Sequence, residues 1–327
     1  MKVKYLITAI GGDIGNSVIH CLYNEFSKNI LVGCDVTPFI PGYDEIGEFF
    51  LAPPYLEEEK YLEFILEKCK KYKITHILPM TEGEIQIFNK YREKTRLAGL
   101  KVMIQNSDLL DIAFSKYNTA LAIKVMGLNS PKTWKPGEIT EEIEYPVIVK
   151  PDRGCGSKYV KIITNLNEYH EAISIIPDAV IQEYIGKPED EYTVGLFSNG
   201  KNVKVIAFKR MLDLNGMSKV VEVIEDKKIN DIAETIAKYF NLKGSINFQM
   251  RKQRDQYYIF EINPRISSTV GFRYKLGFKD IIWWLELLDG NENEIYYKQE
   301  ELPIMGVRSY EEKIFRSLSI TSKTIRL

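Results

Sequence analysis

Patterns of buried strands alternate with helical patterns through the first third of the chain. Continuous apolar runs predict strands at residues 3–10, 30–34, 74–79 and 101–104. Helical spacing predicts helices at residues 17–26, 57–72 and 82–95. Strands that alternate with helices of this length form a parallel sheet that is covered on both faces. This pattern restricts the first third of the chain to an α/β fold.

The pattern changes after residue 145. A helix is predicted at residues 107–127, and Pro131, Pro136 and Gly137 then mark a boundary. Strands are predicted beyond it at residues 147–150, 159–163, 180–184, 192–198, 203–209, 245–251 and 257–262, with helices at 166–175 and 228–240. We therefore expect a β-rich α+β region. The length of 327 residues is consistent with two or three domains.

The composition excludes several classes of protein. Lys plus Arg number 44 and Asp plus Glu 45, so the net charge of −1 argues against nucleic acid or an anionic membrane as the main partner. The four cysteines and three histidines are scattered, which predicts no zinc site and no disulfide framework. A reducing cytoplasm fits best. No apolar stretch approaches the ~20 residues that a membrane-spanning helix needs.

The last two predicted strands carry an unusual set of polar residues. A turn at residues 254–256 joins them and places Gln249 opposite Glu261, and Asn263 shares a strand face with Glu261. Three oxygen-bearing side chains at a strand end suit Mg²⁺, which keeps waters and bridges substrate phosphates. The apolar alternates are expected to point into the core: Ile246, Phe248, Phe260 and Ile262.

Lys150 ends another predicted strand and is followed by a loop that contains Gly154 and Gly156. Backbone N–H groups of such a loop can bind phosphate oxygens, and the lysine adds a positive charge. A simple hairpin turn is an equal alternative.

A third segment reads Gln182-Glu183-Tyr184-Ile185, with Glu191 a few residues on. A strand that leads into a linker can offer backbone groups to an adenine edge, and the later carboxylate can accept ribose hydroxyls. The alternative is that these carboxylates are solvated.

Basic residues form the fourth element. Arg210, Arg265 and Arg273 can each pair with a nearby carboxylate. On one face with Lys150, Arg210 and Arg265 would instead clamp a triphosphate.

Taken in order, these segments resemble the ATP-grasp superfamily, and the branch related to the large subunit of carbamoyl phosphate synthetase in particular. The resemblance covers nearly the whole chain, and its most specific part is Gln249 with Glu261-Ile-Asn263-Pro-Arg265. It implies an α/β Rossmann-like pre-ATP-grasp domain (residues 1–112) followed by an α+β two-lobed ATP-grasp fold. Residues 113–185 would form the small lobe with the phosphate loop. Residues 186–327 would form the large lobe with the metal site and the C-terminal tail.

The resemblance also implies roles for single residues. Lys116 and Lys150 match the cations that hold the nucleotide phosphates, and Arg153 to Ser157, including Gly154 and Gly156, match the loop that closes over them. Glu183 and Ile185 match the adenine-binding linker, and Glu191 matches the ribose acceptor.

The remaining matches concern the metal and the transferred phosphoryl group. Glu261 and Asn263 match the Mg²⁺ ligands, with Mn²⁺ as an alternative ion, and Gln249 matches a further metal ligand. Arg265 matches the cation that stabilises the transferring phosphoryl group.

In this family ATP phosphorylates a carboxylate, and an amine then displaces the phosphate. The resemblance thus implies an ATP-dependent carboxylate–amine ligase whose partners are small molecules. An amino acid, a small acid or a carboxylated nucleotide sugar would fit as substrate. The chain departs from the family at Ile266 to Val270, which replace a glycine-rich stretch facing the acceptor substrate. Ser267 and Arg273 are the substrate candidates there, and Arg273 could equally form a salt bridge on its helix.

The N-terminal loop Gly11-Gly12-Asp13-Ile14-Gly15 leaves an alternative open. Asp35 follows about 20 residues later, as in the dinucleotide-binding fingerprint, so an NAD-dependent oxidoreductase competes with the ligase. In related ligases a similar loop holds an anionic substrate group, which makes Gly12 and Asp13 substrate candidates.

Two further expectations stay open. Glu82 and Glu84 follow the third predicted strand and can contact substrate or cap their helix. A non-catalytic nucleotide-binding module is a third reading of the chain, and Trp283-Trp284 on an apolar helix leaves a homodimer open.

Overall fold

The computed structural model describes all residues except 1–2, 139–142, 155–158, 214–215, 310 and 316–327. The chain forms two compact units. The first unit takes its described residues from 1–106, 265–294 and 309–327, and the second from 107–264 and 295–308.

The first unit contains a parallel five-stranded sheet in the order β3-β2-β1-β4-β5. Its strands are β1 (Tyr5–Ile7), β2 (Leu31–Asp35), β3 (Glu48–Leu51), β4 (His76–Leu78) and β5 (Lys101–Val102). Its helices up to residue 106 are α1 (Asp13–Glu25), α2 (Glu58–Tyr72), α3 (Glu82–Lys90) and α4 (Arg92–Leu97). The predicted α/β alternation is confirmed, although sequence periodicity missed β3 and merged α3 with α4.

Two later helices belong to this first unit. Helices α9 (Val270–Lys275) and α10 (Asp280–Leu288) pack against α1. The sequence analysis placed these residues in the large lobe with 186–264. The lobe boundaries stay a prediction, but the packing on α1 and the ion pair between Lys279 and Glu25 attach this segment to the first unit.

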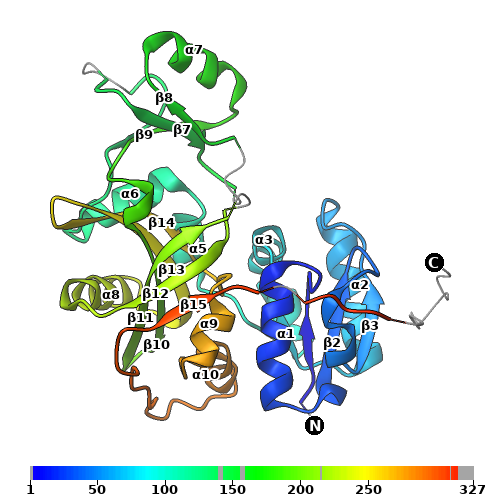
Figure 1. The fold of residues 1–327 in the computed structure, drawn as a ribbon. Helices are drawn as coiled ribbons and strands as arrows, with labels where there is room; N and C mark the ends of the chain where they lie inside the picture. The colour runs from blue at the N-terminus through cyan, green and yellow to red at the C-terminus, as the bar shows by residue number, and fades with distance from the viewer. Residues whose placement is uncertain (1–2, 139–142, 155–158, 214–215, 310, 316–327) are drawn as a thin grey trace. The chain divides into compact units, whose positions relative to one another are not determined.

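The second unit is built on a six-stranded antiparallel sheet in the order β14-β13-β10-β11-β12-β15 (Figure 1). Its strands are β10 (Glu191–Asn199), β11 (Val203–Leu212), β12 (Ser218–Ile224), β13 (Lys243–Gln253), β14 (Gln256–Asn263) and β15 (Met305–Val307). Helices α5 (Ser107–Ala113), α6 (Lys116–Val125) and α8 (Lys227–Tyr239) share one apolar core with this sheet. Alternation along the strands therefore leaves the other face of the sheet for polar side chains.

A smaller antiparallel sheet in the same unit has the order β6-β9-β7-β8. It consists of β6 (Thr133–Trp134), β7 (Val147–Pro151), β8 (Lys161–Ile163) and β9 (Ala179–Glu183), and helix α7 (Leu166–Ile175) packs on it. Short 3₁₀ helices occur at Lys28–Ile30, Pro41–Glu45 and Pro188–Asp190. The expected α+β character of this region is confirmed.

The single helix predicted at residues 107–127 is wrong, because the structure breaks it between α5 and α6. Ser115 caps the second helix: its Oγ accepts a hydrogen bond from the backbone N–H of Asn118 at 3.0 Å. Serine favours this position because its hydroxyl replaces a missing intrahelical acceptor. The break places Lys116 at the start of α6.

The β13–β14 hairpin has the predicted register, with Gln249 opposite Glu261. Arg254 and Asp255 form its two-residue turn, with φ of +46° and +61°. The register shifts next to Gln249, since Met250 pairs with Ile259 and leaves Phe260 as the extra residue of a bulge. Phe260 is half-buried and outside the apolar core. The expectation that it points into the core is therefore wrong.

Candidate functional site

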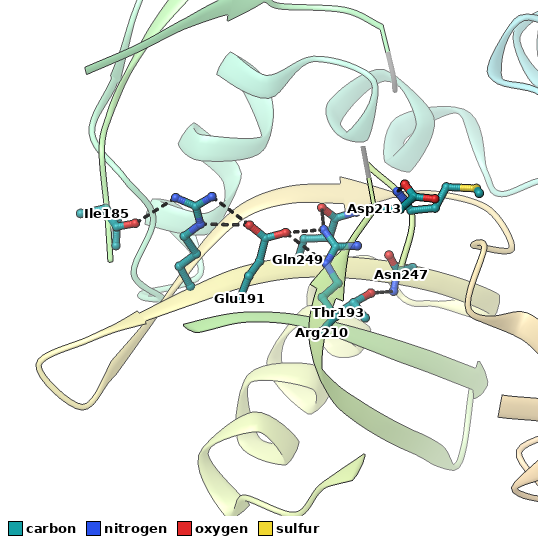
Figure 2. Close-up of polar contacts among 9 residues, drawn as sticks. Ile185, Glu191, Thr193, Arg210, Asp213, Asn247 and Gln249 are labelled. Carbon is teal, nitrogen blue, oxygen red and sulfur yellow. Dashed lines mark hydrogen bonds and ion pairs between the residues drawn. The ribbon is translucent and has the colours of Figure 1, made fainter. Parts of the chain in front are cut away.

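Buried and half-buried polar side chains cover the face of the large sheet that points away from α8. On β13, Asn247, Gln249 and Arg251 alternate with the core residues Phe248 and Met250. Their partners come from the neighbouring strands β10, β11 and β14, as Figure 2 shows in part. The alternation of strand side chains brings these polar groups together.

Glu191 lies between two arginines. Arg210 donates to Oε1 of Glu191 from Nε at 3.1 Å and from Nη2 at 2.6 Å, and Arg251 donates to Oε2 from Nε at 3.0 Å. The Glu191 side chain is only 6% exposed, so its charge depends on these pairs. A carboxylate has about four acceptor positions; these hydrogen bonds use two on Oε1 and one on Oε2, so Oε2 keeps a lone pair for a further donor.

Gln249 joins this cluster through Arg210, whose Nη2 donates to Oε1 of Gln249 at 2.7 Å (Figure 2). Two hydrogen bonds fix the side chain of Asn247: its Nδ2 donates to Thr193 Oγ1 at 2.8 Å and to Val194 O at 2.9 Å. Arg210 therefore lies on the predicted side of the site but is engaged with Glu191 and Gln249. Its contact with a triphosphate stays a prediction.

The expected metal ligands are adjacent in the sheet. Gln249 is paired with Glu261 and Asn247 with Asn263, so the four side chains come from neighbouring positions of one hairpin. Within the described residues no three His, Cys, Asp or Glu side chains are grouped to hold a metal ion. One carboxylate with amide oxygens fits Mg²⁺ that keeps waters and shares phosphate oxygens, and does not fit an all-protein cage.

Lys150, at the end of β7, is buried, and its Nζ donates to Gln182 Oε1 at 2.7 Å. Gln182 is oriented in turn by donating from Nε2 to Thr133 Oγ1 at 3.0 Å. Burial lowers the pKa of Lys150 to about 8, while the charge of Glu261 opposes that shift. The ammonium also lies 5.8 Å from the centre of the Phe260 ring. This cation is thus held by an amide oxygen rather than by an ion pair.

Lys116 approaches the same loop that follows Lys150. Its Nζ donates to Asp152 O at 3.2 Å and to Gly154 O at 2.9 Å. The Asp152 carboxylate fixes the start of α6 by accepting from Ser115 Oγ and from the backbone N–H of Tyr117. Arg153 is exposed, and Gly154 has φ of +118°, where glycine is favoured. Gly156 and Ser157 lie outside the described residues.

The linker residues lie beside the Glu191 cluster. The Ile185 carbonyl accepts from Arg251 Nη1 at 3.5 Å, and the Arg251 guanidinium lies 5.5 Å from the centre of the Tyr184 ring. Glu183 is tied to β6, since its Oε2 accepts from the backbone N–H of Lys132 at 3.2 Å. Figure 2 shows Glu191 between Ile185 and Arg210.

In the first unit, the N-terminal loop makes internal contacts. The Gly11 N–H donates to Oδ2 of Asp35 at 2.8 Å, and the Gly12 N–H donates to Ala9 O at 3.2 Å. Gly15 lies in the first turn of α1, and a Cβ there would lie 2.4 Å from Ala9 O, so only glycine fits at this position. Gly12 caps α1 without a side-chain hydrogen bond, and Asp13 begins the helix. Their substrate role stays a prediction.

Glu82 and Glu84 have separate partners. Glu84 forms a capping box with Thr81 and also accepts from Thr8 and Tyr61, so the capping alternative holds for this residue. Burial raises the pKa of Glu84. Glu82 accepts from Arg265 Nη2 at 3.1 Å, whereas the Nε of Arg265 is buried and has no hydrogen-bond partner among the described residues. Arg265 thus keeps a donor that a substrate oxygen can use.

Arg273 is fully buried and forms the salt bridge that the sequence left as an alternative. Its Nη2 donates to Asp280 Oδ2 at 2.9 Å, and its Nη1 donates to Ser267 Oγ and Thr269 Oγ1, both at 2.7 Å. Since the side chain is 0% exposed, it has no surface through which to anchor a substrate. We therefore correct the substrate assignment of Arg273, and the Ser267 hydroxyl is part of the same network.

Three residues were not predicted from the sequence to belong to the site: Arg251, Asn247 and Phe260, of which Phe260 was expected in the core. Arg251 and Asn247 could have been found, because they lie two residues on either side of Gln249 on the same strand face. Phe260 could not, because the bulge that redirects it depends on pairing with β13.

Two protein-family models match this chain, one in its N-terminal third and one in the region that follows. Residues 113–269 match the ATP-grasp domain model, and residues 5–103 match the model of the PylC-like N-terminal domain. Residues 113–269 therefore belong to the ATP-grasp superfamily, and they follow a PylC-like N-terminal domain, as the resemblance implied in outline. The curated relatives of the chain include large chains of carbamoyl phosphate synthase. The oxidoreductase alternative rested on the N-terminal loop, which lies in the PylC-like match.

Among curated proteins, the chain is 24% identical over 247 residues to the carbamoyl phosphate synthase large chain of Sulfurisphaera tokodaii. The match covers 69% of this chain and 23% of that protein. The chain thus spans about a quarter of the length of this curated relative.

Two solved structures share the fold. The L-amino acid ligase from Bacillus licheniformis has a TM-score of 0.69 at 16% identity, covering 88% of this chain and 74% of that one. The biotin carboxylase domain of the Hydrogenobacter thermophilus 2-oxoglutarate carboxylase, solved with MgADP, ADP and bicarbonate, has a TM-score of 0.72 at 15% identity. That match covers 100% of this chain and 83% of the other. No helix in the described part of the chain is long and apolar enough to cross a membrane.

Proposed function

We propose that this protein is an ATP-dependent carboxylate–amine ligase that works through an acyl phosphate and releases ADP and phosphate. One observation carries the proposal. The charges of Lys116, Arg251, Glu191 and Glu261 act on the buried Lys150, whose Nζ binds Gln182, and Arg210 binds the same Glu191. Four cations in this group face two carboxylates, so the group as a whole favours an anion such as a triphosphate.

The reaction needs no protein nucleophile. A carboxylate oxygen of the first substrate attacks the γ-phosphorus of ATP, and the bond from that phosphorus to the bridging oxygen of ADP breaks. The amine then attacks the acyl carbon, and phosphate leaves with the C–O electron pair while the amine proton passes to solvent. Catalysis of such steps consists mostly of positioning and charge neutralisation.

The positions of the side chains support the roles that we propose for the nucleotide-binding residues. Lys150 and Lys116 hold the triphosphate charge, and the exposed Arg153 adds to it from the loop. Glu191 accepts from the ribose hydroxyls through the remaining lone pair of its Oε2. The linker, Glu183 to Ile185, would lie along the edge of the adenine ring.

Glu261, Asn263 and Gln249 would hold Mg²⁺, or Mn²⁺ in its place. The ion, when bound, supplies neutralisation of the phosphate charge. Arg265 is proposed to stabilise the transferred phosphoryl group or the intermediate, while Glu82 holds one end of its guanidinium.

The substrates belong to the same proposal. The first is an amino acid, a small acid or a carboxylated nucleotide sugar, and the second is an amine. Gly12, Asp13, Glu82 and Ser267 remain the proposed contacts to them, and a homodimer remains the proposed assembly.

ADP formation tests this function directly. Purified protein with Mg·ATP is screened against carboxylates crossed with amines, and ADP release that requires both partners is the expected result. Glu261→Gln should lower that rate at least about 100-fold, because Glu261 is the one carboxylate among the three proposed metal ligands and the amide is neutral. Glu234→Gln is the matched control, since Glu234 is exposed on α8. It should leave the rate unchanged.

Three results would contradict the proposal or part of it. A folded Glu261→Gln variant with the wild-type rate would remove the metal assignment. Failure of the wild type to bind Mg·ATP by calorimetry would remove the ligase itself. Binding of ATP without ADP formation under any pair of substrates would favour the non-catalytic module.

A further inference from the structure

Arg251 connects the two segments that the proposed function assigns to the nucleoside. It lies on β13 at the end nearest the turn, and its side chain is 18% exposed. Its Nε and Nη2 both lie 3.0 Å from Oε2 of Glu191, and its Nη1 lies 3.5 Å from the carbonyl oxygen of Ile185. One guanidinium therefore contacts both the proposed ribose acceptor and the linker.

The surroundings of Arg251 reinforce this connection. The Tyr184 ring lies under the guanidinium at 5.5 Å, a distance at which a cation and an aromatic face attract. Two residues further along β13, Gln253 Oε1 accepts from the backbone N–H of Gly186 at 2.7 Å. Gly186 has φ of +62°, and a Cβ there would lie 2.8 Å from Lys252 O. The end of β13 thus fixes the linker at two points.

We propose that Arg251 is a positioning residue for the ribose of ATP, and that it acts by holding Oε2 of Glu191 in the orientation that accepts the ribose hydroxyls. The inference rests on the proposed function, because Glu191 can accept hydrogen bonds from a ribose only if the site binds a nucleotide. Arg251 itself does not need to touch the nucleotide.

The chemistry of the pair explains why arginine suits this position. Arg210 restrains Oε1 of Glu191 and Arg251 restrains Oε2, so the carboxylate plane cannot rotate. A planar guanidinium can bind the carboxylate with two nitrogens and still present a third to the Ile185 carbonyl. A lysine ammonium offers its donors from one point and cannot span both groups as well.

The competing explanation is that Arg251 only neutralises a buried carboxylate. The two explanations differ in what happens to the ribose. A purely structural role would weaken all adenine nucleotides to the same degree, whereas a positioning role would weaken most the nucleotide that carries both hydroxyls.

The test compares the binding of Mg·ATP and Mg·2′-deoxy-ATP to the full chain by calorimetry. We expect the wild type to prefer ATP by about tenfold, the value of one lost hydrogen bond to a charged group. In Arg251→Met the Kd for ATP should rise about tenfold and that for 2′-deoxy-ATP less than threefold, so that the preference is lost. Arg251→Lys should lie between the two. Lys252→Met is the matched control, because Lys252 pairs with the exposed Asp255, and it should retain the preference.

Equal weakening of both nucleotides, or an unchanged preference in Arg251→Met, would overturn the inference while the ligase proposal stands. If Arg251→Met does not fold, the double variant Glu191→Gln with Arg251→Met removes both charges together. Full ribose preference in that double variant would equally overturn the inference. A folded wild type that binds neither nucleotide would overturn the proposed function and the inference with it.

Discussion

Each unit of the protein contains a buried arginine–carboxylate cluster, and the two differ in charge balance. In the first unit, Arg273 and Asp280 are both 0% exposed and form one pair. The other donors of Arg273 are used by the hydroxyls of Ser267 and Thr269. One positive and one negative charge cancel, and no side-chain atom of the pair reaches solvent.

In the second unit, two arginines share Glu191, and Lys150 has an amide oxygen as its hydrogen-bond acceptor. The charges there do not cancel. Desolvation is costly for any buried charge, so a surplus of buried cations is expected only where an anion will bind. The comparison indicates that a buried cluster with balanced charges stabilises the fold, whereas a buried cluster with excess positive charge belongs to a ligand-binding site.

The largest expected effect is on stability, in the balanced cluster. Arg273→Met leaves Asp280 buried without its cation and should lower the free energy of unfolding by about 3–5 kcal/mol. Urea unfolding followed by circular dichroism measures this loss. The double variant Arg273→Met with Asp280→Leu should recover most of it, because both charges are then gone. A single variant as stable as the wild type would show that the pair does not hold the first unit together.

The next effect is a pH dependence in the unbalanced cluster. Burial lowers the pKa of Lys150 to about 8, so the side chain is protonated below that pH and loses its charge above it. Since a triphosphate binds the protonated form, ATP affinity should fall up to about tenfold between pH 7.5 and pH 9. Calorimetry across this range measures it.

Lys150→Arg provides the control for this pH dependence, because arginine stays charged throughout the range. Its affinity for ATP should stay level from pH 7.5 to pH 9. A wild type whose affinity is equally level would contradict the assignment of Lys150 to the phosphates.

The smallest effect belongs to an exposed pair that gives the baseline for both clusters. Lys227 lies 2.8 Å from Asp231 on α8, and their side chains are 85% and 57% exposed. Asp231→Asn should change the free energy of unfolding by less than about 0.5 kcal/mol, because water screens the pair. A loss above about 1 kcal/mol would mean that the exposed fraction of an ion pair does not predict its contribution to the free energy of unfolding of this protein.

Local sequence patterns predicted much of the site. The turn at Arg254 and Asp255 follows from its place between two apolar strands, and the register of Gln249 with Glu261 follows from counting outward from that turn. The resemblance to the ATP-grasp superfamily rested on these same residues, and the domain matches confirm it. The roles of individual residues stay predictions.

The pattern failed where a single residue changes its environment. Phe260 reads as a core residue by alternation, but the bulge beside Gln249 removes it from the core. The break before Lys116 was missed for a similar reason, because the capping residue Ser115 also binds Asp152, which lies just after β7 and is distant in the sequence.

The sequence by itself determined the two kinds of sheet, the closing hairpin and the polar face of β13, because strand periodicity and turn geometry depend on neighbours along the chain. Only the tertiary structure decided which charges are paired. Arg273 pairs with Asp280 and Arg251 with Glu191 because folding brings their elements together. The local sequence alone does not distinguish an arginine that is paired within the protein from one that binds a ligand.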